Sequence, residues 1–241
     1  MKKFSLLICG SALISIGCSD IDSENVKTAG IGAKIVVESS QADNTRVSTK
    51  LYAGKPSPTS TLLELSSEDK LIAAVGDKSQ TLGKNTDFVN NLSYEATFDE
   101  NIGNTEYLVK FLRGEEESLE SSVNLPDPFT IETSSFNQQS LTLTWAPKSE
   151  NGSKMEAFVE MNCIGEDSKK QRRAGTYDVT DTGSWSITLA QLPEIEADKS
   201  TCEVSVKLSR INTGSLDADF GEGGSIEGIQ SRTVTVSYVT E

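Results

Sequence analysis

The sequence contains no histidine in its 241 residues. This absence excludes Ser-His-Asp and Cys-His catalysis, removes the ligand that most zinc sites use, and leaves no ordinary pH switch near neutrality. Carboxylates are among the catalytic groups that remain, but pairs of acids occur in every acidic chain and do not by themselves indicate a glycosidase. We therefore expect a non-catalytic protein, with a histidine-free carboxylate-based hydrolase as the alternative.

Basic residues are also scarce. The chain has 22 lysines and arginines against 36 aspartates and glutamates, a formal net charge of −14. Such a surface repels phosphate backbones, so we expect no nucleic-acid partner. No cofactor is expected either, although an acidic surface suits hard divalent cations and leaves calcium open.

Long hydrophobic runs are missing as well. The longest begins at Phe4 and ends at Ile16, which is shorter than the about 20 apolar residues that a membrane-spanning helix needs. Two lysines precede the run, and the small residue Gly17 follows it. This is the pattern of a secretory signal peptide, which predicts removal of residues 1–17.

Cys18 follows that small residue directly. The tripeptide Ile16-Gly17-Cys18 resembles the end of a bacterial lipoprotein signal, although Ser15 departs from its preferred leucine. The resemblance implies that Cys18 is acylated, which would hold the protein firmly on a membrane, because two or three acyl chains anchor far better than one. Ser19 resembles the outer-membrane class of these proteins. An ordinary secreted protein is the alternative.

The location and partners follow from that resemblance. We expect a protein that is lipid-anchored in the bacterial outer membrane and faces the periplasm or the cell surface. From the sequence we expect the lipid to be its only membrane contact, and an envelope or extracellular protein or a glycan is left open as its partner.

Only Cys163 and Cys202 remain besides Cys18 once the signal is removed. Both stand at apolar positions of an alternating pattern, so both are expected to face inward. The compartment beyond the inner membrane is oxidising, which favours a structural disulfide between them.

The rest of the chain alternates apolar and polar residues and shows no long helical pattern. In LTLTW, for example, Leu141, Leu143 and Trp145 face one way while the threonines face the other. This period of two is typical of half-buried antiparallel strands. The sequence therefore predicts an all-β fold.

An internal repeat divides these strands. TEYLVKFLRGEEESLE, from Thr105, matches CEVSVKLSRINTGSLD, from Cys202, at six identical positions, and KLYAGK resembles LTWAPK upstream at nearly the same offset. An offset near 95 is about the length of one immunoglobulin-like sandwich. Two prolines in LPDPF mark the boundary. The predicted units are a lipidated cysteine and flexible tether at 18–30, a first sandwich at 31–125, and a second at 126–241.

The second unit resembles a fibronectin type III domain. The resemblance is carried by Leu141–Pro147 with Trp145, and by Leu192-Pro193 before the strand that begins at Cys202. It implies two tandem immunoglobulin-like sandwiches that serve binding or structural support, or an accessory subunit of an envelope assembly. Cys202 stands where the family has a tyrosine, and such folds host many functions.

The segment NTGSLDADFGEGGSIEG, residues 212–228, is the loop that we expect to bind a partner, because it is longer than its counterpart in the repeat. A solvated connecting loop is the alternative. Its acids do not match EF-hand spacing but are weak calcium candidates: Asp217, Asp219, Glu222 and Glu227.

Replacing Cys18 with serine should leave an unlipidated precursor, because only the thiol accepts the diacylglyceryl group. Metabolic labelling with a clickable fatty acid measures this directly. Equal labelling of Cys18→Ser and the natural chain would refute the lipoprotein prediction.

Overall fold

The computed structural model describes most of the chain after the predicted signal. The lipidation motif at Cys18 lies outside the described residues. These are 21–40, 44–86, 91–114, 117–134, 140–148, 154–165, 168, 170–192 and 201–239.

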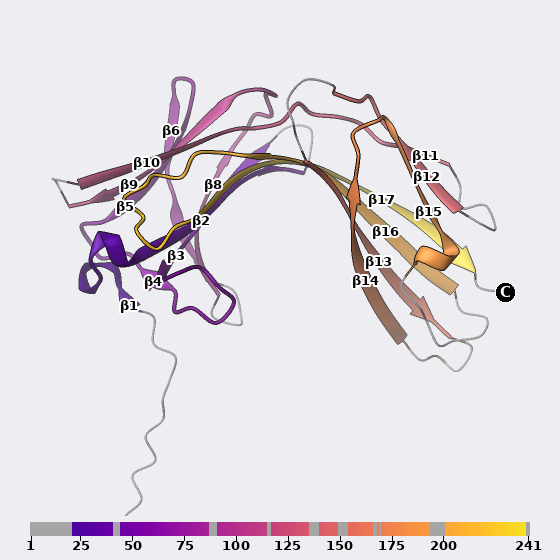
Figure 1. The fold of residues 1–241 in the computed structure, drawn as a ribbon, viewed down its shortest axis with the longest axis horizontal. Helices are drawn as coiled ribbons and strands as arrows, with labels where there is room; N and C mark the ends of the chain where they lie inside the picture. The colour runs from indigo at the N-terminus through magenta and orange to yellow at the C-terminus, as the bar shows by residue number, and fades with distance from the viewer. Residues whose placement is uncertain are drawn as a thin grey trace, which may run out of the picture.

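Strands dominate both halves of the molecule, and the predicted all-β fold of two tandem immunoglobulin-like sandwiches is confirmed. Figure 1 shows the two sandwiches as the legs of an arch. Among the described residues, no helix is long and apolar enough to cross a membrane.

The first sandwich has two facing sheets. One contains β2 (Ile31–Ser39), β3 (Thr45–Ala53), β8 (Leu92–Phe98) and β7 (Gly83–Thr86); the other contains β10 (Glu117–Asn124), β9 (Glu106–Arg113), β5 (Lys70–Val75) and β6 (Lys78–Thr81). A short parallel pair, β1 (Ile21–Asp22) and β4 (Leu63–Glu64), lies beside them, with 3-10 turns η1 (Ser23–Asn25) and η2 (Thr28–Gly30).

The second sandwich is built in the same way. One sheet contains β11 (Glu132–Thr133), β12 (Ser140–Thr144) and β15 (Ser184–Thr188); the other contains β14 (Lys170–Val179), β13 (Lys154–Ile164), β16 (Thr201–Thr213) and β17 (Gly224–Val239). A 3-10 turn, η3 (Leu189–Gln191), follows β15.

Strand order supports the repeat seen in the sequence. If β1, β4 and β7 are set aside as short additions, both sandwiches pair their first, second and fifth strands in one sheet and their third, fourth, sixth and seventh in the other. β9 and β16, which carry the matching sequences, are the sixth strand of their sandwiches. β3 and β12, which carry the upstream match, are the second.

β17 joins the two sandwiches into one sheet. It pairs antiparallel with β16 of the second sandwich and parallel with β2 of the first, which gives a continuous sheet of eight strands. Ile226 packs into the first core, while Val234 and Val236 pack against the second. Side chains two apart on a strand share a face, so both smaller sheets cover the same face of the large one. Its other face is the concave side of the arch (Figure 1).

The segment between β16 and β17 is part of the first core, and its interpretation as a free binding loop is wrong. Phe220 is 4% exposed and stacks on Phe111, with ring centroids 6.2 Å apart. Gly221 packs so closely on Ala29 that a Cβ atom would lie 2.4 Å from the Ala29 carbonyl oxygen. The glycines therefore permit close backbone approach rather than loop motion.

Both ends of the first sandwich thus extend beyond the predicted range of 31–125. The part of β17 from Gly224 to Gln230 pairs with β2, although the sequence assigned it to the second sandwich. Residues 21–30, expected to be a flexible tether, are packed, and Ser23 is fully buried among them. Period-two alternation identifies strands but not the sandwich to which a strand belongs, which explains the difference.

Replacing Phe220 with alanine should lower the free energy of unfolding by about 3–5 kcal/mol, as is usual for a buried phenylalanine. Asp219→Ala, one residue away on an exposed side chain, is the matched control and should stay within about 0.5 kcal/mol. Urea unfolding measures both. Equal stability of the two variants would show that the segment contributes nothing to the core.

Candidate binding surface

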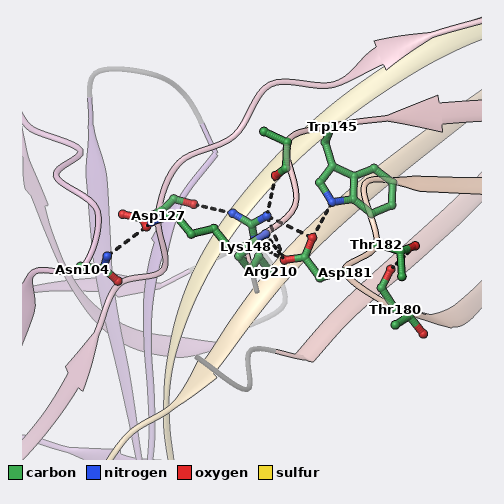
Figure 2. Close-up of polar contacts among 9 residues, drawn as sticks. Asn104, Asp127, Trp145, Lys148, Thr180, Asp181, Thr182 and Arg210 are labelled. Atoms are coloured by element: carbon green, nitrogen blue, oxygen red, sulfur yellow. Dashed lines mark hydrogen bonds and ion pairs between the residues drawn. The ribbon is translucent and has the colours of Figure 1, made fainter. Parts of the chain in front are cut away.

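A buried arginine fixes the junction between the sandwiches (Figure 2). Arg210, on β16, is 1% exposed. Its Nε donates to Asp181 Oδ2 at 3.0 Å, and its two terminal nitrogens donate to the carbonyl oxygens of Asp127 at 3.2 Å and Ala146 at 3.1 Å. A buried guanidinium is tolerated only when it is paired and hydrogen-bonded in this way. Arg210 therefore holds the linker against the second sandwich.

The partners of Arg210 are themselves held. Trp145 Nε1 donates to Asp181 Oδ1 at 2.7 Å, so the tryptophan that carries the family resemblance orients the acid. The Asp127 carboxylate accepts a bond of 2.9 Å from Asn104 of the first sandwich and pairs with Lys148 of the second. One aspartate in the linker therefore contacts both sandwiches (Figure 2).

A second polar cluster crosses the junction on the concave face. Glu38, near the end of β2, accepts a hydrogen bond from Lys207 Nζ of β16 at 2.6 Å and from Ser231 Oγ of β17 at 3.0 Å. Arg46 of β3 adds a longer ion pair at 4.0 Å. The cluster therefore links four neighbouring strands of the large sheet.

Glu38 is a charged group at neutral pH. Burial alone would raise the pKa of its carboxyl, but the hydrogen bond and charge of Lys207, helped by Ser231 and Arg46, outweigh burial and lower it below the ordinary value of 4.5. The carboxylate is therefore ionised and accepts hydrogen bonds from its neighbours.

A groove opens on the same concave face. Its volume is about 560 Å³, and its apolar lining consists of the cross-strand pair Ile211 and Ile229 and, further along the strands opposite Lys207, Phe158 of β13. Phe158 is 39% exposed, because no second layer of the described strands covers this face of the sheet. The groove is framed by charged and hydroxyl side chains: Glu38, Lys154, Glu156, Lys207, Ser209, Thr213 and Glu227.

A larger hollow of about 920 Å³ adjoins this groove and shares Lys154, Ile211 and Thr213 with it. Its remaining lining is mostly amide and hydroxyl: Asn104, Glu106, Ser122, Val123, Asn124, Asn212, Gly214 and Ser215. The two hollows together form a surface that is apolar in the middle of the sheet and polar toward the junction. Such a surface suits a partner that offers both hydrogen bonds and apolar contact.

Two carboxylates of this face, Glu38 and Glu160, form ion pairs with neighbouring cationic side chains. Glu160 on β13 resembles Glu38, because the hydrogen bond from Arg172 lowers its pKa. A general acid requires the opposite displacement, toward neutrality. These two acids are therefore suited to structural pairing rather than to proton donation.

The predicted disulfide is present. Cys163 and Cys202 lie opposite each other in the pairing of β13 with β16 and are joined by an S–S bond of 2.10 Å. Both are buried in the second core, as the alternation indicated.

The calcium candidates are not gathered into one site. Asp217 accepts hydrogen bonds from the backbone amides of Glu120 at 2.6 Å and Asp219 at 2.9 Å, so its oxygens bind the protein itself. Glu227 lies on the concave face within β17, whereas Glu222 precedes that strand. Within the described ranges, no group of three or more acidic or cysteine residues is arranged to hold a metal ion.

Sequence reasoning missed the concave groove. The signal that could have revealed it is Phe158, an aromatic residue at an outward position between the inward Ala157 and Val159 of the same strand. Ile211 and Ile229 break the alternation in the same way on β16 and β17. That these three residues line one groove depends on strand register, which one sequence does not give.

Comparison with known proteins adds two solved structures. The chain is similar to the chicken CNTN1 FN1–FN3 domains, with 9% identity and a TM-score of 0.29 over 87% of this chain and 63% of that one, so it spans less than two thirds of that protein segment. It is also similar to a two-domain fibronectin type III segment from chicken tenascin, with 12% identity and a TM-score of 0.23 over 87% and 98% of the two chains. No protein-family model and no curated protein matches the chain. The fold is defined by the strand order of the two sandwiches.

Replacing Glu38 with glutamine should destabilise the protein only where Glu38 is ionised. A carboxyl whose pKa is lowered by folding contributes stability that is complete above its ordinary value and is lost as the pH falls through the lower, folded value. We expect a loss on the order of 1 kcal/mol near neutrality, which vanishes once the pH is low enough to protonate Glu38 in the folded protein. Urea unfolding at several pH values tests this, with Glu227→Gln, further along the same face, as the control. A loss of stability that does not change with pH would show that the ionised form of Glu38 is not its cause.

Proposed function

We propose that this chain is a lipid-anchored, non-catalytic protein of the bacterial outer membrane that binds a macromolecular partner on the concave face of its arch. The observation that carries the proposal is the continuous eight-stranded sheet, which leaves one face open across both sandwiches. The signal that ends in Cys18 supports the anchor.

The rigidity of the junction supports binding. Arg210 and Asp127 hold the linker on the convex side, and Glu38 with Lys207 holds the concave side. A surface that needs no reordering on association loses less conformational entropy when a partner binds. The two sandwiches are therefore a preformed platform rather than two modules on a flexible hinge.

The size of the surface supports a macromolecule rather than a small ligand. A stable protein interface covers about 800 Å² on each partner, which a sheet of eight strands provides. The exposed Phe158 supplies an apolar anchor on the concave face, and aromatic anchors of this kind carry much of the energy of such interfaces. A protein or glycan of the envelope fits this chemistry, as does a larger assembly in which the chain is an accessory subunit.

A photo-crosslinking residue at position 158 should capture a partner in intact cells, because this side chain is exposed and lines the groove of the proposed surface. The matched control is Ile102, another exposed large apolar side chain (54% exposed), in the turn between β8 and β9. Covalent adducts are separated by mass and identified by peptide sequencing.

A discrete adduct at position 158 that is absent at position 102, and that is lost when Ile211 and Ile229 are both replaced by serine, would support the concave face. Identical adducts at both positions would refute it. Thermal unfolding of the double variant shows whether it still folds.

A further inference from the structure

The first ten described residues form a strap that is tied into the first sandwich. Ser23 is fully buried; its Oγ donates to Asp69 Oδ2 at 2.6 Å and accepts from the backbone amide of Ser66 at 2.9 Å. Ile21 begins the strap in the parallel β1–β4 pair, and its amide donates to the carbonyl oxygen of Leu62 at 3.4 Å. The strap is therefore part of the fold from Ile21 onward.

Arg113, at the end of β9, holds the strap from the inside. One terminal nitrogen donates to the carbonyl oxygens of Ser23 at 2.9 Å and Val26 at 3.0 Å, and the other donates to Thr28 Oγ1 at 2.5 Å. The Arg113 side chain is 13% exposed and lies 3.8 Å from Asp69. A single guanidinium thus binds three points of the strap, and a segment held in this way does not act as a flexible spacer.

The attachment leaves little chain between the fold and the lipid. Only Ser19 and Asp20 separate Cys18 from Ile21, and an extended chain spans at most about 3.6 Å per residue. The Cα atom of Ile21 therefore lies within about 11 Å of that of Cys18. Since the acyl chains of Cys18 enter the bilayer, Ile21 must lie at the level of the lipid headgroups.

We propose that the end of the first sandwich formed by β1 and the loop between β3 and β4 rests on the bilayer surface. This inference rests on the lipidation of Cys18 in the proposed function. It commits to one occupant, the membrane that holds the anchor, and gives the arch a fixed orientation on it. β1 and that loop lie together at the lower end of the first sandwich in Figure 1.

The composition of this end fits a headgroup layer. The loop contains Lys55 and then PSPTST, residues 56–61, without an acid in a strongly acidic chain. Ile21, beside it, is 37% exposed and can enter the interface. Asp22 and Glu24 are exposed on the strap itself, so the lipid rather than charge supplies the attraction.

The far end of the same sandwich provides an internal reference. β5 begins directly after Asp69, beside the strap, and its six residues run to the turn that contains Asp77. At about 3.3 Å per residue this turn lies about 20 Å from the strap. Its distance from the bilayer should therefore differ clearly from that of the β3–β4 loop.

The test measures fluorescence quenching in vesicles of phosphatidylethanolamine and phosphatidylglycerol that carry a nitroxide on the headgroup. The full lipidated chain is labelled at Thr59→Cys in the β3–β4 loop or at Asp77→Cys in the β5–β6 turn, with the native disulfide intact. We expect quenching to be several-fold stronger at position 59. Inserting about ten glycine and serine residues between Asp20 and Ile21 adds roughly 17 Å of reach and should remove most of that difference.

Three outcomes separate this inference from the proposed function. Lipid on Cys18 with the expected contrast, reduced by the insertion, supports both. Lipid on Cys18 with equal quenching at the two positions, or a contrast that the insertion does not change, overturns the orientation and leaves the anchor intact. Mass spectrometry that finds no lipid on Cys18 overturns both.

Discussion

The backbone hydrogen bonds of β17 are the constraint on which the arrangement of the molecule depends. One strand of 16 residues completes the second sandwich along its antiparallel partner and, at its other end, extends the first sandwich along a parallel partner. One half of a strand cannot rotate relative to the other without breaking the backbone hydrogen bonds to its neighbours, because alternate side chains are fixed to opposite faces. The open faces of the two sandwiches therefore coincide, and a single concave surface results.

Each sandwich uses one arginine to bind the segment of chain that leads into it. Arg113 and Arg210 are matched residues of the repeat; Arg113 is the last residue of β9, and Arg210 lies three residues before the end of β16. Arg113 binds the carbonyl oxygens of the N-terminal strap together with Asp69, whereas Arg210 binds those of the linker together with Asp181. A guanidinium suits this task because its donors reach several carbonyl oxygens from one position while an acid balances its charge.

Period and repeat were sufficient to predict the fold class, the two sandwiches and the disulfide, because each of these depends on local alternation or on spacing along the chain. The burial of Phe220 and of the strap could not be predicted in the same way. Both segments lack a period, and their burial depends on contacts with residues far away in the sequence, such as Phe111 and Arg113. The concave groove depends on register for the same reason, although an outward-facing Phe158 was a visible signal.

The edges of the large sheet also favour binding on its open face. An unpaired strand edge invites the addition of another strand, and proteins commonly prevent this with short or charged edge strands. β7 at one edge has four exposed residues, and β14 at the other carries Lys170 and Arg172, the latter paired with Glu160. Both edges thus discourage strand addition, while the open face exposes Phe158 beside Lys207, which is paired with Glu38. A partner that approaches the sheet therefore gains more from its concave face than from its edges.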